Sequence, residues 1–476
     1  MLSAYERYLI AFYLANIAGR LRPQDREAFA LVDWIRERND RSAYDRRKDL
    51  FSRLARMDID LWESDSKRQL RNLRQALRNE CAALKGTKLD PTAQRLRLLG
   101  KATDLEPIDV DILEVLLRYQ TQSVIESMID HIFSRAVRRA EPLNVRGAAI
   151  PALIGASPGA VHHRRGQGAP LVSSGLVVID SDGVMTPVDR LQRLAMVSGK
   201  AGLDVNRLLL DAAPGSELEW ADFDHIAEGR DHIERLIRGA LQTGTPGVNV
   251  LLYGAPGTGK SEFCKVLAER LGATLYSVGE ADDDGDEPSR RTRLQELRLA
   301  QRLLRWNRGS LLLFDEMEDL LSDSPAGEFL FFGHSFSSGA RFGGSKVYIH
   351  RLLERAPAPT LWTMNDARSV NQALLRRMMF ALELRPPTAA VRARIWTRQL
   401  EHHGIEAGPD EAHALAREFA ATPGVAAGAT AAARIGGGGI ETVRRGVRGL
   451  SRVLCCEAPP QGTPPLFDPP LIHADF

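Results

Sequence analysis

An α/β fold, with a parallel sheet between helices, is predicted for the centre of this chain by three apolar segments that end in polar residues. The segments are NVLLYG (249–254), SLLLFDE (310–316) and PTLWTMND (359–366). Apolar runs of this length, bounded by turns, are typical of strands buried on both faces. Because parallel sheets bind ligands at the carboxyl ends of their strands, the polar residues after each run are expected to face one crevice.

Length and composition limit the possible classes of protein. The 476 residues are enough for several domains of roughly 100–200 residues each, and 44% hydrophobic with 26% charged residues predicts folded cores rather than disorder. The 63 basic and 61 acidic residues leave a formal net charge of +2, so overall charge favours no class of partner. The four cysteines lack C-x-x-C spacing, which argues against a zinc site or disulfide framework and suits a cytoplasmic protein.

The apolar run LIAFYLANIAG (9–19) resembles a secretion signal at first sight. It is too short to span a bilayer, no A-x-A cleavage site follows, and Glu6 cancels Arg7 in front of it. We therefore expect an ordinary helix that faces a core, and no association with a membrane.

Residues 1–102 are predicted to form a helical, arginine-rich region. In the segment 66–85, leucines recur at intervals of three and four, which is typical of the apolar side of a helix. A parallel basic stripe consists of Arg71, Arg74, Arg78 and Lys85. We interpret this stripe as a solvated helix face, and the alternative is a surface for phosphates or an acidic partner.

Residues 103–215 are predicted to form a winged-helix-like domain. Two helical segments come first, followed by a helix, a turn at 156–158 and a short second helix. The segment GLVVIDSDGVMTP (175–187) then has the pattern of a β-hairpin. In DNA-binding winged helices the second helix enters the major groove, and here it would present His162, His163, Arg164 and Arg165. We favour a structural or protein-binding role, because this helix is short and its neighbours carry little charge.

The loop after the first apolar run has the pattern G-x-x-x-x-G-K-[ST]. It lies between a predicted strand and a predicted helix, as a phosphate-binding loop requires. Glycines allow backbone N–H groups to surround phosphate oxygens, the lysine reaches the β- and γ-phosphates, and the hydroxyl binds Mg²⁺. The predicted nucleotide-binding residues are Gly254, Ala255, Pro256, Gly257, Thr258, Gly259, Lys260, Ser261 and Glu262.

Two carboxylates end the second apolar run. Asp315 is predicted to hold Mg²⁺ together with Ser261, and Glu316 is predicted to orient and deprotonate the attacking water. Asn365, after the third run, could hold that water or sense the γ-phosphate. Arg376 and Arg377 follow, and a guanidinium that reaches the site can stabilise the charge of a transition state.

The order of these motifs resembles that of the AAA ATPases. The resemblance covers about half the chain, from WADFDHIAEG to SRVLCCE. It implies an α/β core at 216–387, a helical lid at 388–458, ATP and Mg²⁺ as ligands, and a ring of identical subunits, usually a hexamer. In such a ring Arg376 or Arg377 would act as a finger on the neighbouring subunit's nucleotide.

The resemblance is incomplete at two places. LLRRMMF departs from the widespread L-L-R-P-G-R-F, which leaves the finger's identity open between Arg376 and Arg377. Gly424 stands where some relatives carry a second-sensor arginine, with Arg434 and Arg444 as possible substitutes. The proline-rich segment 459–476 resembles the connector that follows the first module of bacterial tandem AAA ATPases.

AAA unfoldases commonly grip polypeptides with an aromatic residue after the second core strand. The corresponding loop here, EADDDGDEPSRR (280–291), is acidic and contains no aromatic residue. The cluster FLFFGHSF (329–336) is either a substrate or partner surface, or part of a core. The sequence therefore predicts a Mg²⁺-dependent ATP hydrolase that remodels or regulates an unidentified protein partner. The main alternative is an ATP-gated DNA-binding switch, and a kinase is a remote third.

Overall fold

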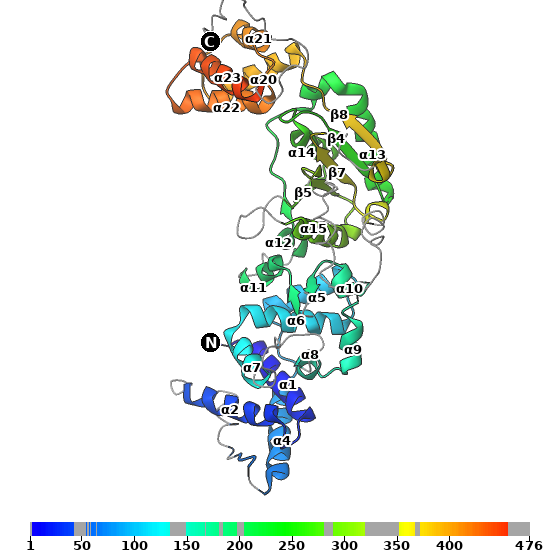
Figure 1. Ribbon diagram of the computed structural model, residues 1–476, viewed down its shortest axis with the longest axis vertical. Helices are drawn as coiled ribbons and strands as arrows, with labels where there is room; N and C mark the ends of the chain where they lie inside the picture. The colour runs from blue at the N-terminus through cyan, green and yellow to red at the C-terminus, as the bar shows by residue number, and fades with distance from the viewer. Residues whose placement is uncertain are drawn as a thin grey trace, which may run out of the picture.

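The structure is a computed structural model of the chain. It describes residues 2–41, 54, 57, 59–62, 64–133, 149–166, 168–179, 184–197, 204–279, 289–318, 352–366 and 372–455. The acidic segment 281–288, the aromatic cluster 329–336 and the proline-rich segment 459–476 lie outside these residues. N-terminal helices, a central sheet and C-terminal helices follow one another along an elongated molecule (Figure 1).

The described part of residues 1–102 is mainly helical, as predicted, with α1 (Ala4–Arg20), α2 (Arg26–Arg41), α4 (Ser66–Leu84) and α5 (Pro91–Ala102). The helices α6 (Pro107–Thr121) and α7 (Ser123–Phe133) follow at the start of the segment 103–215. The described residues before position 210 are together called the N-terminal region. The amide of Glu6 donates to Ser3 Oγ at 3.1 Å, and this cap starts α1. Leu9, Ile10 and Leu14 of α1 are buried, which confirms that the run 9–19 faces a core.

One residue of the predicted basic stripe has a structural role. Arg74 on α4 donates from Nε to the carbonyl oxygen of Ala18 at 2.8 Å, and from Nη2 to that of Leu21. These acceptors lie at the C-terminal end of α1, where carbonyl groups lack helical partners and cations are favoured. Arg71, Arg78 and Lys85 are exposed, in agreement with a solvated face.

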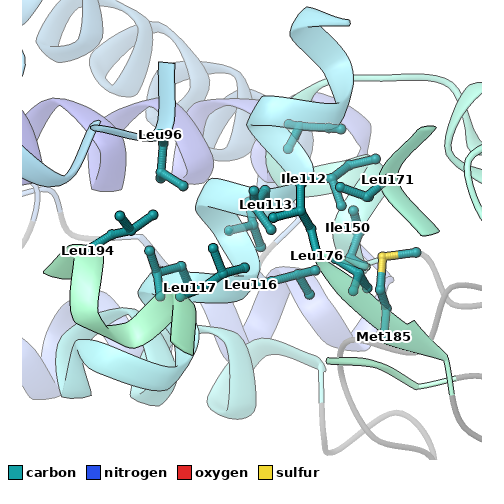
Figure 2. Close-up of a cluster of buried hydrophobic side chains, with 14 of the residues drawn as sticks. Leu96, Ile112, Leu113, Leu116, Leu117, Ile150, Leu171, Leu176, Met185 and Leu194 are labelled. Carbon is teal, nitrogen blue, oxygen red and sulfur yellow. The ribbon is translucent and has the colours of Figure 1, made fainter. Parts of the chain in front are cut away.

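The segment 149–212 combines short helices with a small antiparallel sheet. Its elements are α8 (Ala149–Ile154), α9 (Pro158–His163), α10 (Pro170–Ser173), β1 (Val177–Ile179), β2 (Met185–Pro187), η2 (Asp189–Gln192), α11 (Arg193–Met196) and α12 (Val205–Leu209). β1 and β2 pair antiparallel, which confirms the predicted hairpin. Figure 2 shows Ile150, Leu171, Leu176 and Met185 gathered beside the leucines of α6.

The central sheet has six strands in the order β3-β5-β6-β7-β4-β8. The strands are β3 (Asp211–Ala212), β4 (Asn249–Tyr253), β5 (Thr274–Val278), β6 (Ser310–Phe314), β7 (Thr360–Met364) and β8 (Phe380–Glu383). All neighbours are parallel except β3, which runs antiparallel to β5. The parallel sheet is confirmed, whereas β3 and β8 were not predicted. Because β7 lies between β6 and β4, the polar ends of all three predicted strands meet at one edge.

The side chains of each strand alternate between two cores. Leu251, Leu312, Phe314 and Trp362 belong to one hydrophobic cluster, which includes α15 (Arg290–Leu303) and continues into the N-terminal helices. The next positions along the strands face a second cluster, formed with η4 (Trp220–Ile226), α13 (Ala227–Thr243), α14 (Lys260–Leu271), α20 (Ala389–His402), α21 (Pro409–Glu418), α22 (Pro423–Ile435) and α23 (Ile440–Cys455). Two short helices, η5 (Leu304–Trp306) and α19 (Gln372–Leu375), complete the described elements. No helix in these described ranges is long and apolar enough to cross a membrane.

Candidate active site

The loop between β4 and α14 requires glycine at its first position. Gly254 has φ +147°, and a Cβ atom there would lie 2.4 Å from the carbonyl oxygen of Leu384. Gly257 has φ +76°, and its Cβ would lie 2.7 Å from Thr422 Oγ1, at the start of α22. The loop therefore passes close to both β8 and the C-terminal helices. It ends at the N-terminus of α14, where backbone N–H groups lack helical acceptors and favour anions.

We expect Gly254→Ala to lower the free energy of unfolding by about 1–3 kcal/mol, because the new Cβ meets a backbone atom and the φ angle is strained. Gly424→Ala is the matched control, since its Cβ would meet nothing within 4 Å and its φ is ordinary. Denaturant unfolding of both variants measures the difference. Equal stability of the two variants would contradict the close approach between Gly254 and Leu384.

Lys260 joins the loop to the end of β7. Its Nζ donates to the carbonyl oxygens of Gly254 and Ala255, at 2.9 and 3.1 Å, and to Asn365 Oδ1 at 2.9 Å. Burial lowers the pKa of Lys260, while the nearby Asp315 carboxylate acts in the opposite direction. Three neutral acceptors thus hold an ammonium group at the loop, and phosphate oxygens are stronger acceptors for the same protons.

Asp315 lies against the other end of the same loop. Ser261 Oγ donates to Asp315 Oδ2 at 2.6 Å, and Thr363 Oγ1 donates to Asp315 Oδ1. The amide of Glu316 donates to Thr363 Oγ1 at 3.1 Å. Glu316 is exposed and has φ +53°, one of only two positive values among the described non-glycine residues. Thr363 therefore fixes the carboxylate of one acidic residue and the backbone of the next.

The structure separates the predicted site residues into two groups. Hydrogen bonds join Lys260 to Asn365 and Ser261 to Asp315, so these four residues gather at one sheet edge. Arg376 and Arg377 directly follow α19 and precede β8, which begins at Phe380. Arg376 is exposed, whereas Arg377 Nε donates to Glu354 Oε1 at 3.0 Å.

The remaining predicted residues have contacts outside this group. Glu262 accepts from Ser216 Oγ at 2.6 Å and from Lys265 Nζ at 2.7 Å, which connects α14 to the segment before η4. Arg444, a suggested second sensor, pairs with Glu441 at 2.7 Å and with Glu418 at 3.4 Å. Arg434, the other candidate, is exposed.

Two residues that hold the site were not found from the sequence. Thr363 is fully buried inside a strand, and a buried hydroxyl needs a hydrogen-bond partner. A threonine in a strand predicted to be buried could therefore have indicated a polar contact at this position. Arg293 Nη1 donates to the carbonyl oxygen of Glu316 at 3.4 Å, and Nη2 donates to that of Asp315. Its segment, RRTRLQELR, contains four arginines, and nothing in the pattern distinguishes this one.

The donor set of Ser261 and Asp315 suits Mg²⁺ bound with a nucleotide. One hydroxyl and one carboxylate leave most of an octahedral shell to phosphate oxygens and water, which is the usual arrangement for Mg²⁺. Within the described part of the chain, no group of three or more His, Cys, Asp and Glu side chains could hold a metal by itself. The residues present therefore fit a cation that arrives with its substrate.

Two comparisons with known proteins cover part of the chain. A solved structure, "Crystal structure of FIGL-1 AAA domain in complex with ADP", matches 48% of this chain and 76% of that one, with 18% sequence identity and a TM-score of 0.36. Residues 250–385 match the family described as "ATPase family associated with various cellular activities (AAA)". Residues 250–385 are therefore similar to this family, and the matched segment contains Lys260, Ser261, Asp315 and Asn365.

Proposed function

We propose that this protein is a Mg²⁺-dependent ATP hydrolase of the AAA type, which uses ATP to remodel or regulate a protein partner. One observation carries the proposal. Lys260, Ser261, Asp315 and Asn365, from the loop and two further strand ends, are joined by hydrogen bonds at one edge of a parallel sheet. Ligands bind at this edge in open α/β sheets.

Each residue would have a distinct task. Lys260 and the backbone N–H groups of the loop would hold the phosphates, and Ser261 and Asp315 would hold Mg²⁺. Bound there, Mg²⁺ would neutralise charge that develops on the phosphate oxygens. Glu316 would orient the attacking water and accept its proton, and Asn365 would help to place that water. Thr363 keeps Asp315 and Glu316 in position for these tasks.

We expect Lys260→Ala to weaken ATP binding by about 10–150-fold, because hydrogen bonds to charged groups contribute about 1.5–3 kcal/mol. Lys265→Ala is the matched control: it removes the same charge from the same helix but breaks only the pair with Glu262. Calorimetric titration with Mg-ATP measures both. Wild-type affinity in Lys260→Ala would contradict the nucleotide site, as would a wild type that binds no ATP.

The protein-partner role is favoured over the DNA-binding alternative by the contacts of Arg164. This side chain pairs with Glu106 at 2.5 Å and with Asp109 at 3.0 Å, so it is not presented to a phosphate backbone. A partner protein should stimulate hydrolysis, while DNA should not. Steep loss of DNA affinity with rising salt would reverse this preference. The resemblance to AAA ATPases also supports a ring of identical subunits. We propose a cytoplasmic location because the four cysteines lack the spacing of a disulfide framework.

A further inference from the structure

Helix α15 lies between the N-terminal region and the sheet (Figure 1). Its 14 residues span about 21 Å at 1.5 Å per residue. Along this length it contacts the backbone of the predicted catalytic residues at one end and the N-terminal region at several points. These contacts give the helix a role beyond covering the sheet.

At the first end, Arg293 is fixed on several sides. Its side chain is 7% exposed and its guanidinium lies 4.6 Å from the centroid of the Phe314 ring. A Cβ at Gly279 would lie 2.8 Å from Arg293 Cγ, so glycine is needed there for the arginine stem to pass. Held in this way, the guanidinium donates to the carbonyl oxygens of Asp315 and Glu316.

One turn further along, Glu296 connects the helix to the N-terminal region. Glu296 Oε1 accepts from Arg190 Nε at 2.8 Å, and Oε2 accepts from the amide of Gly279 at 2.9 Å. Arg190 belongs to η2, is 8% exposed, and also donates to Asp211 Oδ2 at 2.7 Å. Gly279 therefore lies against both the Arg190–Glu296 pair and the side chain of Arg293.

The rest of the helix is held by the same region. A Cβ at Gly175 would lie 2.6 Å from the carbonyl oxygen of Gln295, so this turn packs directly on the helix backbone. Arg302 Nε donates to the carbonyl oxygen of Thr103 at 2.9 Å, and just beyond the helix Arg305 Nη1 donates to Asp104 Oδ2 at 2.6 Å. A movement of the N-terminal region relative to the sheet must therefore move α15 or break these contacts.

We propose that α15 makes ATP hydrolysis depend on the N-terminal region, with Arg293 as a positioning residue for Asp315 and Glu316. This inference rests on the proposed ATPase function. Glu316 has a backbone conformation that L-residues rarely adopt, and it persists because surrounding groups hold it. Thr363 holds its amide and Arg293 holds its carbonyl. A partner that displaces η2 acts on Glu316 through Glu296 and Arg293, and changes kcat rather than ATP affinity.

The first test replaces Arg293 by Met and by Lys. Met keeps the aliphatic stem between Phe314 and Gly279 but donates no hydrogen bond, so the fold is maintained while the carbonyl contacts are lost. We expect kcat to fall by about 10²-fold, the loss that a misplacement of about 1 Å can cause. KM and the Kd for ATP should stay within about 3-fold, since the phosphate-binding contacts are intact. Lys, with one donor group, should retain an intermediate kcat.

The second test addresses the connection to the N-terminal region. Arg190→Gln should lower kcat in the same way, although Arg190 contacts neither Asp315 nor Glu316 through any hydrogen bond described above. When Arg190→Gln is combined with Arg293→Met, the further fall in kcat should be small, because both substitutions interrupt the same series of contacts. Arg193→Gln is the matched control: it removes the same charge nearby, but the pair it breaks is with Asp211 at 2.9 Å rather than with Glu296. It should leave kcat unchanged, both alone and in combination with Arg293→Met.

A nucleotide-free measurement separates this inference from the proposed function. Hydrogen–deuterium exchange should become faster at Gly279 and at residues 315–317 in Arg190→Gln, and remain as in wild type in Arg193→Gln. If the wild type hydrolyses ATP and Arg293→Met keeps its kcat, the positioning role is wrong. If the wild type hydrolyses no ATP, the proposed function fails, and the exchange measurement alone tests the connection through α15. Unchanged exchange at 315–317 in Arg190→Gln would overturn that connection.

Discussion

Arg376→Ala is expected to lower kcat for ATP hydrolysis by about 10³–10⁵-fold, the contribution of an arginine finger in other phosphate-loop enzymes. Arg376 is exposed, whereas Arg377 is committed to an ion pair with Glu354. An exposed guanidinium can reach a neighbouring subunit without first breaking a contact, so we expect Arg377→Ala to have the smaller effect. ATP binding should be kept in both variants, because Lys260, Ser261 and Asp315 are unchanged.

Mixed assemblies test whether this arginine acts between subunits. Arg376→Ala subunits keep an intact nucleotide site, and Lys260→Ala subunits keep an intact finger. Their mixture should regain part of the activity that each lacks alone, and wild-type specific activity should rise with protein concentration. Full activity in a dilute sample shown to be monomeric would refute the shared site.

The second large effect is expected for Glu316→Gln, which should reduce hydrolysis by about 10²–10⁴-fold and keep ATP binding. Glutamine has the same shape but cannot accept the proton of the attacking water. Glu269→Gln on α14 is the control, since Glu269 is exposed and its contact with the amide of Ser216, at 3.2 Å, is equally possible for a glutamine oxygen. Single-turnover hydrolysis and equilibrium binding separate the two steps.

The same variant can capture the partner. A protein that keeps ATP without cleaving it holds whatever its ATP-bound form engages, so captured proteins should depend on ATP and be absent with Lys260→Ala. Hydrolysis by Glu316→Gln at the wild-type rate would show that Glu316 does not take part in the reaction.

The sheet was predictable where burial imposes a pattern. β4, β6 and β7 are covered on both faces, so apolar residues predominate in their sequences. β8 is an edge strand in which half-buried and exposed residues alternate, and β3 has two exposed residues, so neither produces such a run. The missing strands are those with the least burial.

The site was predictable to the extent that its chemistry lies in local motifs. Gly254–Ser261, Asp315 and Asn365 follow strand ends, and their neighbours in the sequence identify them. The supporting contacts are long-range. Arg293 is 22 residues from Asp315 in the sequence, and Arg164 is 55 residues from Asp109. Because its acidic partner is so distant in the sequence, Arg164 resembled a residue that contacts DNA. Ion pairs of this kind depend on tertiary packing, which no short pattern records.

The hydrophobic cluster that joins the N-terminal helices to one face of the sheet limits how such a chain can be recombined. Modules that are exchanged freely between proteins cover their own apolar surfaces. Here Leu297, Leu299 and Leu303 of α15 are buried in a cluster that continues into α5, α6 and the turns after them. Transplanting the α/β module alone would expose these leucines to water. A chimera with another N-terminal region would need a new polar surface on α15, or a replacement partner with the same shape.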